Sequence, residues 1–151
     1  MTAPKTILIA SLLTASLPES RCESLVNAFA QVESGGHANR IGDHGRARGA
    51  WQFHREAWEQ VTWIRAIERQ TVHTYNKAFD IEISREYARS YIKWLSSRLN
   101  AILRRPATPQ EIYAAWNLGL QGFAERRFRL NRCPASTKAA AKRVRNIVEG
   151  K

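Results

Sequence analysis

The sequence predicts one mostly α-helical domain with at most a small β-element. Three observations lead to this fold class. The chain has 151 residues, which is the size of one domain. Five or six segments have helical periodicity, and no repeat or linker-like segment separates them. Hydrophobic residues make up 44% of the chain and charged residues 25%, so the composition is globular rather than disordered. We place the domain at residues 20–150.

The first half of the chain predicts two helices separated by a polar loop. The first helix covers residues 20–34 and ends at the pair Gly35-Gly36. Residues 37–50 contain three glycines and no apolar period, so we expect a loop there. Residues 49–54 are compatible with a short strand or with a turn into a helix at 54–69. Any β-element is therefore expected in this region.

The middle of the chain predicts a loop followed by a long helix. Residues 70–80 lack an apolar period. Residues 84–104 have an apolar stripe at helical spacing, and Ser84 is the expected N-cap. The Arg104-Arg105-Pro106 sequence ends that helix.

The last part of the chain predicts two more helices. Thr108 and Glu111 have the spacing of a capping box, with Pro109 at the first helical position. We expect that helix to end at Gly119. A final helix is expected at 136–148, with Gly150 as its terminator.

The charge of the chain favours an anionic partner. Lys and Arg number 24 and Asp and Glu 13, which gives a formal net charge of +11. Such a surface attracts nucleic acid, anionic lipid or an anionic cell wall, and the charge alone does not choose among them. No apolar run reaches the ~18 residues of a membrane span, so none is expected.

The two cysteines, Cys22 and Cys133, leave two interpretations open. They are either small buried apolar residues or the two halves of one disulfide in an oxidising compartment. Two cysteines do not build a structural zinc site, and the four histidines lack zinc-motif spacing to them. We therefore expect no metal and no cofactor.

The N-terminal segment 1–19 also has two interpretations. Lys5 followed by the apolar run 7–17 resembles a weak secretory signal. The alternative is an N-terminal helix that caps the domain and ends at Leu17-Pro18.

One carboxylate stands out in the first helix. On a wheel of 100° per residue, Glu33 lies about 80° from Leu25, within the apolar arc. Burial disfavours the ionised carboxylate, and so does the negative end of the helix. Both effects should raise the pKa of Glu33, as a general acid near neutral pH requires.

Three short motifs carry a family resemblance. They are E-S-G-G at 33–36, G-D-H-G-R-A-R-G-A-W-Q-F-H at 42–54 and A-A-W-N-L-G at 114–119. In this order and at these helix ends, they resemble the lysozyme-like superfamily. The resemblance is closest to the soluble lytic transglycosylase (SLT) domain, with similarity to goose-type and invertebrate-type lysozymes. It covers about residues 22–130.

The resemblance implies a catalytic acid, Glu33, and a groove that binds sugars. The residues implied for that groove are Gln52, Asn117, Trp116, Trp51 and Gly49. Trp116 takes the place of the usual Tyr. Amide side chains can donate to and accept from N-acetyl groups, and aromatic faces can stack on sugar rings. We therefore expect the small β-element to line a substrate groove in an α+β lysozyme-like domain.

The implied activity is a peptidoglycan-cleaving muramidase. Its target would be the β-1,4 bond between N-acetylmuramic acid and N-acetylglucosamine, with Glu33 as general acid/base. A lytic transglycosylase leaves a 1,6-anhydro end and uses Glu33 alone. The alternative is a two-carboxylate lysozyme hydrolase that uses Glu33 and Asp43. Asp43 is otherwise a turn residue between Gly42 and Gly45.

Two other function classes remain as alternatives. One is a basic helical nucleic-acid-binding module, and the other is a catalytically silent glycan binder. No helix-turn-helix, zinc-finger or RNA-binding signature is present. We expect peptidoglycan glycan strands as the partner, no stable nucleic-acid partner and a monomer. The expected location is secreted or in the periplasm or cell envelope, with a phage-borne origin or a cytoplasmic pool as the alternatives.

Overall fold

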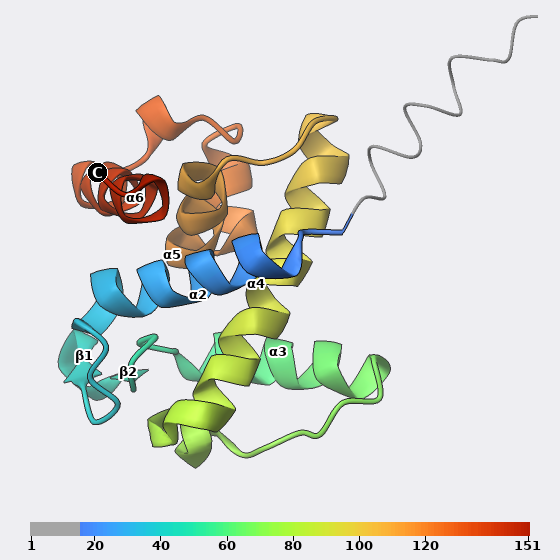
Figure 1. Ribbon diagram of the computed structural model, residues 1–151, viewed down its shortest axis with the longest axis vertical. Coiled ribbons are helices and arrows are strands. Elements are labelled where there is room, and N and C mark those ends of the chain that lie inside the picture. Colours follow the sequence, from blue (N-terminus) through green and yellow to red (C-terminus); the bar gives the residue numbers. More distant parts are fainter. Residues whose placement is uncertain (1–15) are drawn as a thin grey trace, which may run out of the picture. The chain divides into compact units, whose positions relative to one another are not determined.

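The protein is mostly α-helical, as the sequence predicts (Figure 1). A computed structural model describes residues 16–151. The α-helices in this range are α2 (Glu19–Ser34), α3 (Arg55–Ile67), α4 (Ile81–Leu103), α5 (Pro109–Glu125) and α6 (Ala135–Glu149). The strands are β1 (Ile41–Gly42) and β2 (Ala47–Arg48), and the 3₁₀ turns are η1 (Asp43–Gly45), η2 (Tyr75–Phe79) and η3 (Leu130–Arg132). The two interpretations of segment 1–19 concern mainly residues outside this range, and neither is tested.

The chain divides into two compact units, and each is described by itself. The central unit consists of residues 23–91. The terminal unit consists, within the described range, of residues 16–22 and 92–151. The prediction of one domain over residues 20–150 stays a prediction. No helix among the described residues is long and apolar enough to cross a membrane.

The β-element lies slightly earlier than residues 49–54. β1 pairs antiparallel with β2, with Ile41 opposite Arg48 and Gly42 opposite Ala47. A single bridge between Arg48 and Phe53 then closes a turn, so the turn is the correct interpretation of 49–54. Strands of two residues are too short for the alternation of apolar and polar side chains that marks a strand in a sequence.

Helix α4 begins at Ile81 rather than at residue 84, so the N-cap assigned to Ser84 is wrong. Asp80 performs that role, because its Oδ1 accepts hydrogen bonds from the backbone N–H groups of Glu82 and Ile83. Ser84 is buried inside the helix. Both residue types favour the N-cap, so propensity alone did not separate them.

The core of the central unit is built around Trp58 of α3. Its ring stacks on Tyr87 with centroids 3.7 Å apart and meets Phe53 edge-on at 5.3 Å. Its Nε1 donates to the carbonyl of His73 at 2.9 Å. The buried Arg65 guanidinium binds the carbonyl of Thr71 and the carboxylate of Glu86. These contacts hold the chain segment between α3 and η2 against helices α3 and α4.

The terminal unit contains α5, α6 and the last part of α4. Thr108 and Glu111 form the predicted capping box at the start of α5. Gly119 has φ 74° and ψ 157°, so it interrupts the helix as expected. The chain then resumes a helical path to Glu125, which the sequence did not indicate. Helix α6 ends at Gly150 in the left-handed conformation, as predicted.

Cys22 and Cys133 are both buried, and no disulfide joins them in the structure. Burial raises the pKa of the Cys133 thiol above its ordinary value, which favours the neutral form. The structure therefore agrees with the first interpretation, in which both cysteines are small buried residues.

Candidate active site

Glu33 lies in the last turn of α2 and is partly buried. The helix ends directly after it because two glycines follow with φ of 70° and 84°, a conformation that Gly35 and Gly36 adopt without strain. No basic residue lies in this last turn. The carboxylate of Glu33 therefore lies at the junction between α2 and the loop that follows it.

Ser34 fixes the helix end that carries Glu33. Its buried hydroxyl donates to the carbonyl of Ala50 at 2.7 Å and lies 3.3 Å from the carbonyl of Ala30. It also accepts from the backbone N–H groups of Gly36 and His37, both at 3.1 Å. One side chain thus ties the end of α2 to its own exit loop and to the turn at 49–52.

Gln52 ends that turn and holds the loop before it. Its backbone has φ 50°, and its Nε2 donates to the carbonyls of Gly49 at 2.8 Å and Arg40 at 3.1 Å. Both amide hydrogens are used in this way. A Cβ atom at Gly42 would lie 2.2 Å from the Oε1 atom of Gln52. The glycine therefore allows Gln52 to pack against β1.

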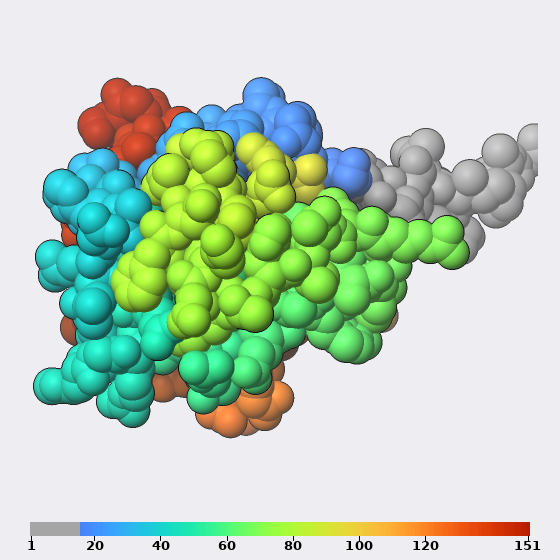
Figure 2. Space-filling view, turned by 90° about the horizontal axis from the view of Figure 1, so that it is seen from below, coloured from blue at the N-terminus to red at the C-terminus, as the bar shows by residue number. Residues whose placement is uncertain are grey.

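Gly49 permits a close approach of two backbone segments. It has φ 79°, and a Cβ atom there would lie 2.0 Å from the carbonyl oxygen of Ala78 in η2. Its N–H donates to the carbonyl of Arg40 at 2.8 Å. Figures 1 and 2 show the hairpin and the start of α4 side by side in this unit. A side chain at position 49 would force the turn at 49–52 away from η2.

Trp51 is a core residue. Its side chain is fully buried, and its Nε1 donates to the carbonyl of Val26 in α2 at 2.9 Å. The guanidinium of Arg85 lies 5.5 Å from the centre of its ring. A buried ring offers no face on which a sugar can stack, so Trp51 supports the turn from beneath instead of binding sugar.

Asp43 is held on the outer part of the hairpin. Its carboxylate lies 3.2 Å from Nε2 of His54 and 3.7 Å from Nη2 of Arg46, and 44% of the side chain is exposed. Asp43 and His44 have φ of 47° and 56°, in the left-handed region. The turn interpretation thus describes the backbone, and Arg46 and His54 hold the carboxylate on the hairpin.

Asn117 and Trp116 belong to the terminal unit. Asn117 is exposed, and its Oδ1 accepts from the hydroxyl of Thr137 at 2.7 Å. Trp116 is half-buried. The backbone of Gly119 leaves the helical path two residues after Asn117. The sequence motif therefore marks a genuine break at the end of the first part of α5.

The central unit brings four of the expected residues into one short segment. Glu33 is joined through Ser34 to the turn that ends in Gln52, Gly49 starts that turn, and Asp43 lies on the preceding hairpin. A family model described as the transglycosylase SLT domain matches residues 14–138. The chain belongs to the SLT transglycosylase family. Comparisons with curated proteins and with solved structures found no match.

Membership supports a peptidoglycan-cleaving function of the lytic transglycosylase type for this SLT domain at the family level. Among residues 16–151, no group of three His, Cys, Asp or Glu side chains could hold a metal ion.

Three supporting residues of the SLT domain had no assigned role from sequence. They are Ser34, His54 and Tyr75. Ser34 appears in the E-S motif, but only its contact with Ala50 gives it a function. The Tyr75 hydroxyl donates to the carbonyl of Phe53 at 2.6 Å and lies 3.0 Å from that of Arg46, 22 and 29 positions away. Contacts over such separations leave no local pattern.

Proposed function

We propose that this protein is a lytic transglycosylase that cleaves the β-1,4 bond between N-acetylmuramic acid and N-acetylglucosamine in peptidoglycan. The observation that carries the proposal is the position of Glu33. It is a partly buried carboxylate in the last turn of α2, and the hydroxyl next to it binds the turn that carries Gln52. The family match supports the reaction class.

Glu33 would act first as an acid and then as a base. The protonated carboxyl gives its proton to the glycosidic oxygen as the bond to C1 of N-acetylmuramic acid breaks. N-acetylglucosamine leaves with a new hydroxyl group. The resulting carboxylate then takes the proton of the 6-hydroxyl, and that oxygen attacks C1. The product carries a 1,6-anhydro ring, no water is consumed, and Glu33 is again protonated.

Gln52 and Asn117 would orient the sugar. Gln52 presents an acceptor, because its two N–H groups hold backbone carbonyls. Asn117 presents a donor, because its oxygen binds Thr137. Either contact suits an N-acetyl group, which has one N–H and one carbonyl. Changing either residue to Ala should cost about 1–3 kcal/mol of transition-state stabilisation. Wild-type turnover in both variants would contradict these roles.

A two-carboxylate hydrolase is the second candidate, and the partners of Asp43 favour it. Arg46 and His54 lie 3.7 and 3.2 Å from the Asp43 carboxylate and hold it on the hairpin, where it could serve as the nucleophile or base. The Asp43→Asn variant separates the two candidates in a turbidity assay on cell walls. A transglycosylase should keep at least about a tenth of its activity. A loss as deep as that of Glu33→Gln would identify the hydrolase.

The same proposal extends to location. A cell-wall enzyme acts in the periplasm, in the envelope or outside the cell, and we propose one of these locations for this chain. We also propose that the chain acts as a monomer. Fractionation of cells that produce the full chain, followed by mass measurement of the envelope form, tests both the location and cleavage within residues 1–19.

A further inference from the structure

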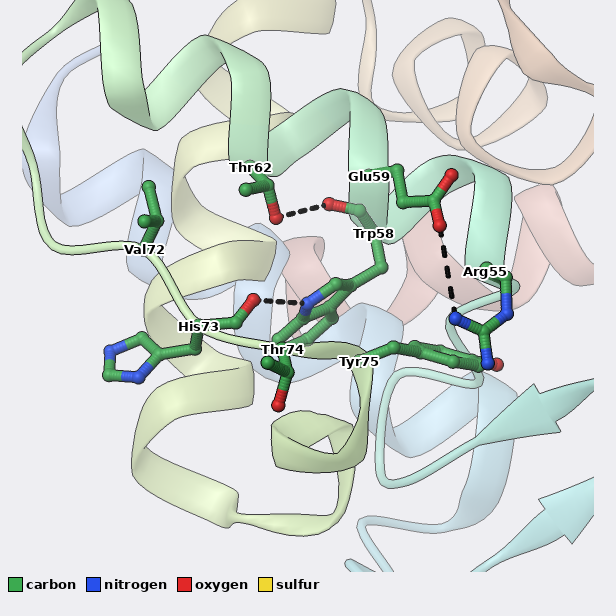
Figure 3. Close-up of a pocket in the computed structure, with 8 residues that line it drawn as sticks. All are labelled: Arg55, Trp58, Glu59, Thr62, Val72, His73, Thr74 and Tyr75. Atoms are coloured by element: carbon green, nitrogen blue, oxygen red, sulfur yellow. Dashed lines mark hydrogen bonds and ion pairs between the residues drawn. The ribbon is translucent and has the colours of Figure 1, made fainter.

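A preformed pocket lies in the central unit, and none of the expected site residues lines it (Figure 3). It has a volume of about 410 Å³, large enough for a peptide fragment. Arg55, Trp58, Glu59 and Thr62 of α3 line one side, and residues 72–75 line the other.

The wall opposite α3 is fixed at several points. The carbonyl of His73 accepts from Trp58 Nε1 at 2.9 Å, and its N–H donates to the Tyr87 hydroxyl at 2.8 Å. Arg65 Nε binds the carbonyl of Thr71 at 2.9 Å. The pocket therefore needs little ordering when a ligand binds, which reduces the entropic cost of binding.

Two side chains of opposite charge, Arg55 and Glu59, lie next to each other at this pocket. Arg55 and Glu59 are one helical turn apart, and their Nη1 and Oε1 atoms are 3.8 Å apart. Their side chains are 60% and 65% exposed, so this ion pair contributes little and can exchange for ligand charges. Figure 3 shows both side chains on one side of the pocket, with Arg55 above the ring of Tyr75.

These charges select a ligand that carries both signs. A lone carboxylate would meet Glu59, and a lone ammonium would meet Arg55. A group with an ammonium and a carboxylate on one carbon satisfies both. On the wall opposite α3, the exposed side chain of Val72 provides apolar surface for an aliphatic chain.

The pocket adjoins the segment that carries Gln52. The Tyr75 ring lines the pocket, while its hydroxyl donates to the carbonyl of Phe53 at 2.6 Å and lies 3.0 Å from that of Arg46. Burial raises the pKa of this phenol above its ordinary value, so it stays protonated as a donor. A polymer bound along this segment would carry its branches past the pocket.

We propose that this pocket binds the peptide branches of the wall polymer through a zwitterionic amino-acid unit, with the carboxylate on Arg55 and the ammonium on Glu59. This inference rests on the proposed function, because peptidoglycan supplies a glycan strand with peptide branches that contain such units. The pocket would then make the enzyme prefer strands that carry peptides.

Binding is tested directly with the tripeptide L-Ala-γ-D-Glu-meso-diaminopimelate, followed by NMR of the full protein. The expected result is shifts at residues 55–62 and 72–75. Glu59→Gln and Arg55→Met should each weaken binding about tenfold, the size of one lost charged contact. Glu56→Gln is the matched control, since it removes an exposed acid on the same helix outside the pocket. Acetylation of the diaminopimelate amine removes the ammonium group. The wild type should therefore bind the acetylated tripeptide about as weakly as Glu59→Gln binds the unmodified one.

Kinetics separate this inference from the proposed function. Glu59→Gln should raise KM several-fold on peptide-bearing strands and leave cleavage of peptide-free glycan strands at the wild-type rate. No shift in the pocket, an equal KM change on both substrates, or binding of free diaminopimelate without any KM change would each overturn the peptide assignment. A wild-type protein that cleaves neither substrate would overturn the proposed function itself.

Discussion

Ser34 fixes the end of α2 that carries Glu33, the proposed catalytic group. It is buried, donates to the turn at Ala50 and accepts from two N–H groups of the loop after α2. Each partner would lose a hydrogen bond if the hydroxyl were removed. The end of α2, and Glu33 with it, would then be less firmly held.

We therefore expect Ser34→Ala to lower the free energy of unfolding by about 1–3 kcal/mol. It should also lower kcat more than it changes KM, because Glu33 would be misplaced during the reaction. Urea unfolding and steady-state kinetics measure the two effects. Ser97→Ala, at an exposed position in α4, is the control and should change stability by less than about 0.5 kcal/mol. Equal effects of the two variants would exclude the anchoring role.

Gly49 gives a second prediction for a single residue. Gly49→Ala combines a left-handed backbone with a Cβ atom 2.0 Å from a backbone oxygen. We expect a loss of at least about 2 kcal/mol in stability. Gly36→Ala has a similar φ of 84° but no atom within 4 Å of the added Cβ. It should therefore cost only the backbone strain of about 1–2 kcal/mol. If thermal unfolding gave equal losses, the close approach to Ala78 would be refuted.

Helix α5 carries a pH-dependent contribution to stability at its N-terminus. Burial raises the pKa of Glu111, but hydrogen bonds from Arg105 and Thr108 outweigh it, so the pKa lies below its ordinary value. Arg105 binds both carboxylate oxygens, at 2.6 and 3.0 Å. A lowered pKa stabilises the folded state above the unfolded pKa of about 4.3, and this stabilisation is lost as pH falls through the folded pKa.

The Glu111→Gln variant should therefore be less stable than the wild type at pH 7, by about 1–2 kcal/mol, since Arg105 is half exposed. The difference should shrink as pH falls below about 4, where the wild type also loses its carboxylate. Denaturant unfolding at pH 7 and pH 3 measures it. A difference that stays constant between these pH values would show that the ionised carboxylate is not responsible.

At the scale of elements, the sequence predicted what local contacts determine. The capping box of Thr108 and Glu111, the break at Gly119 and the end of α6 at Gly150 depend on neighbouring residues. The end of α2 before Gly35 and Gly36, which puts Glu33 in the last turn, is local in the same way. The burial of Trp51 depends on a contact with Val26, 25 positions earlier, and no local pattern contains it. The pocket beside α3 likewise depends on a segment that the sequence indicates only as a loop.

At the scale of the whole molecule, the charge is unevenly distributed. Residues 23–91 carry nine basic and nine acidic side chains, so the formal charge of +11 comes from the rest of the chain. Residues 126–151 alone carry nine basic residues and one acidic residue. The unit that holds Glu33 is thus neutral in formal charge, so we expect the terminal unit to supply any attraction to anionic polymers.

We expect binding to intact sacculi to weaken by about an order of magnitude between low and physiological salt. Lys138→Gln with Lys142→Gln, both exposed on α6, should reduce this binding at low salt. Arg69→Gln with Lys77→Gln, both exposed in the central unit, is the charge-matched control and should change it little. Co-sedimentation measures the bound fraction. Binding that is insensitive to salt, or tighter sequence-dependent binding to duplex DNA, would contradict a wall-associating role.

The central claim is that Glu33 alone transfers the proton in a reaction that needs no water. Mass analysis of the products from purified peptidoglycan tests it most directly. The wild type should release fragments with 1,6-anhydro-N-acetylmuramic acid ends, and Glu33→Gln should release none while it still folds and binds glycan. Reducing ends from the wild type, or anhydro products from Glu33→Gln, would contradict the account.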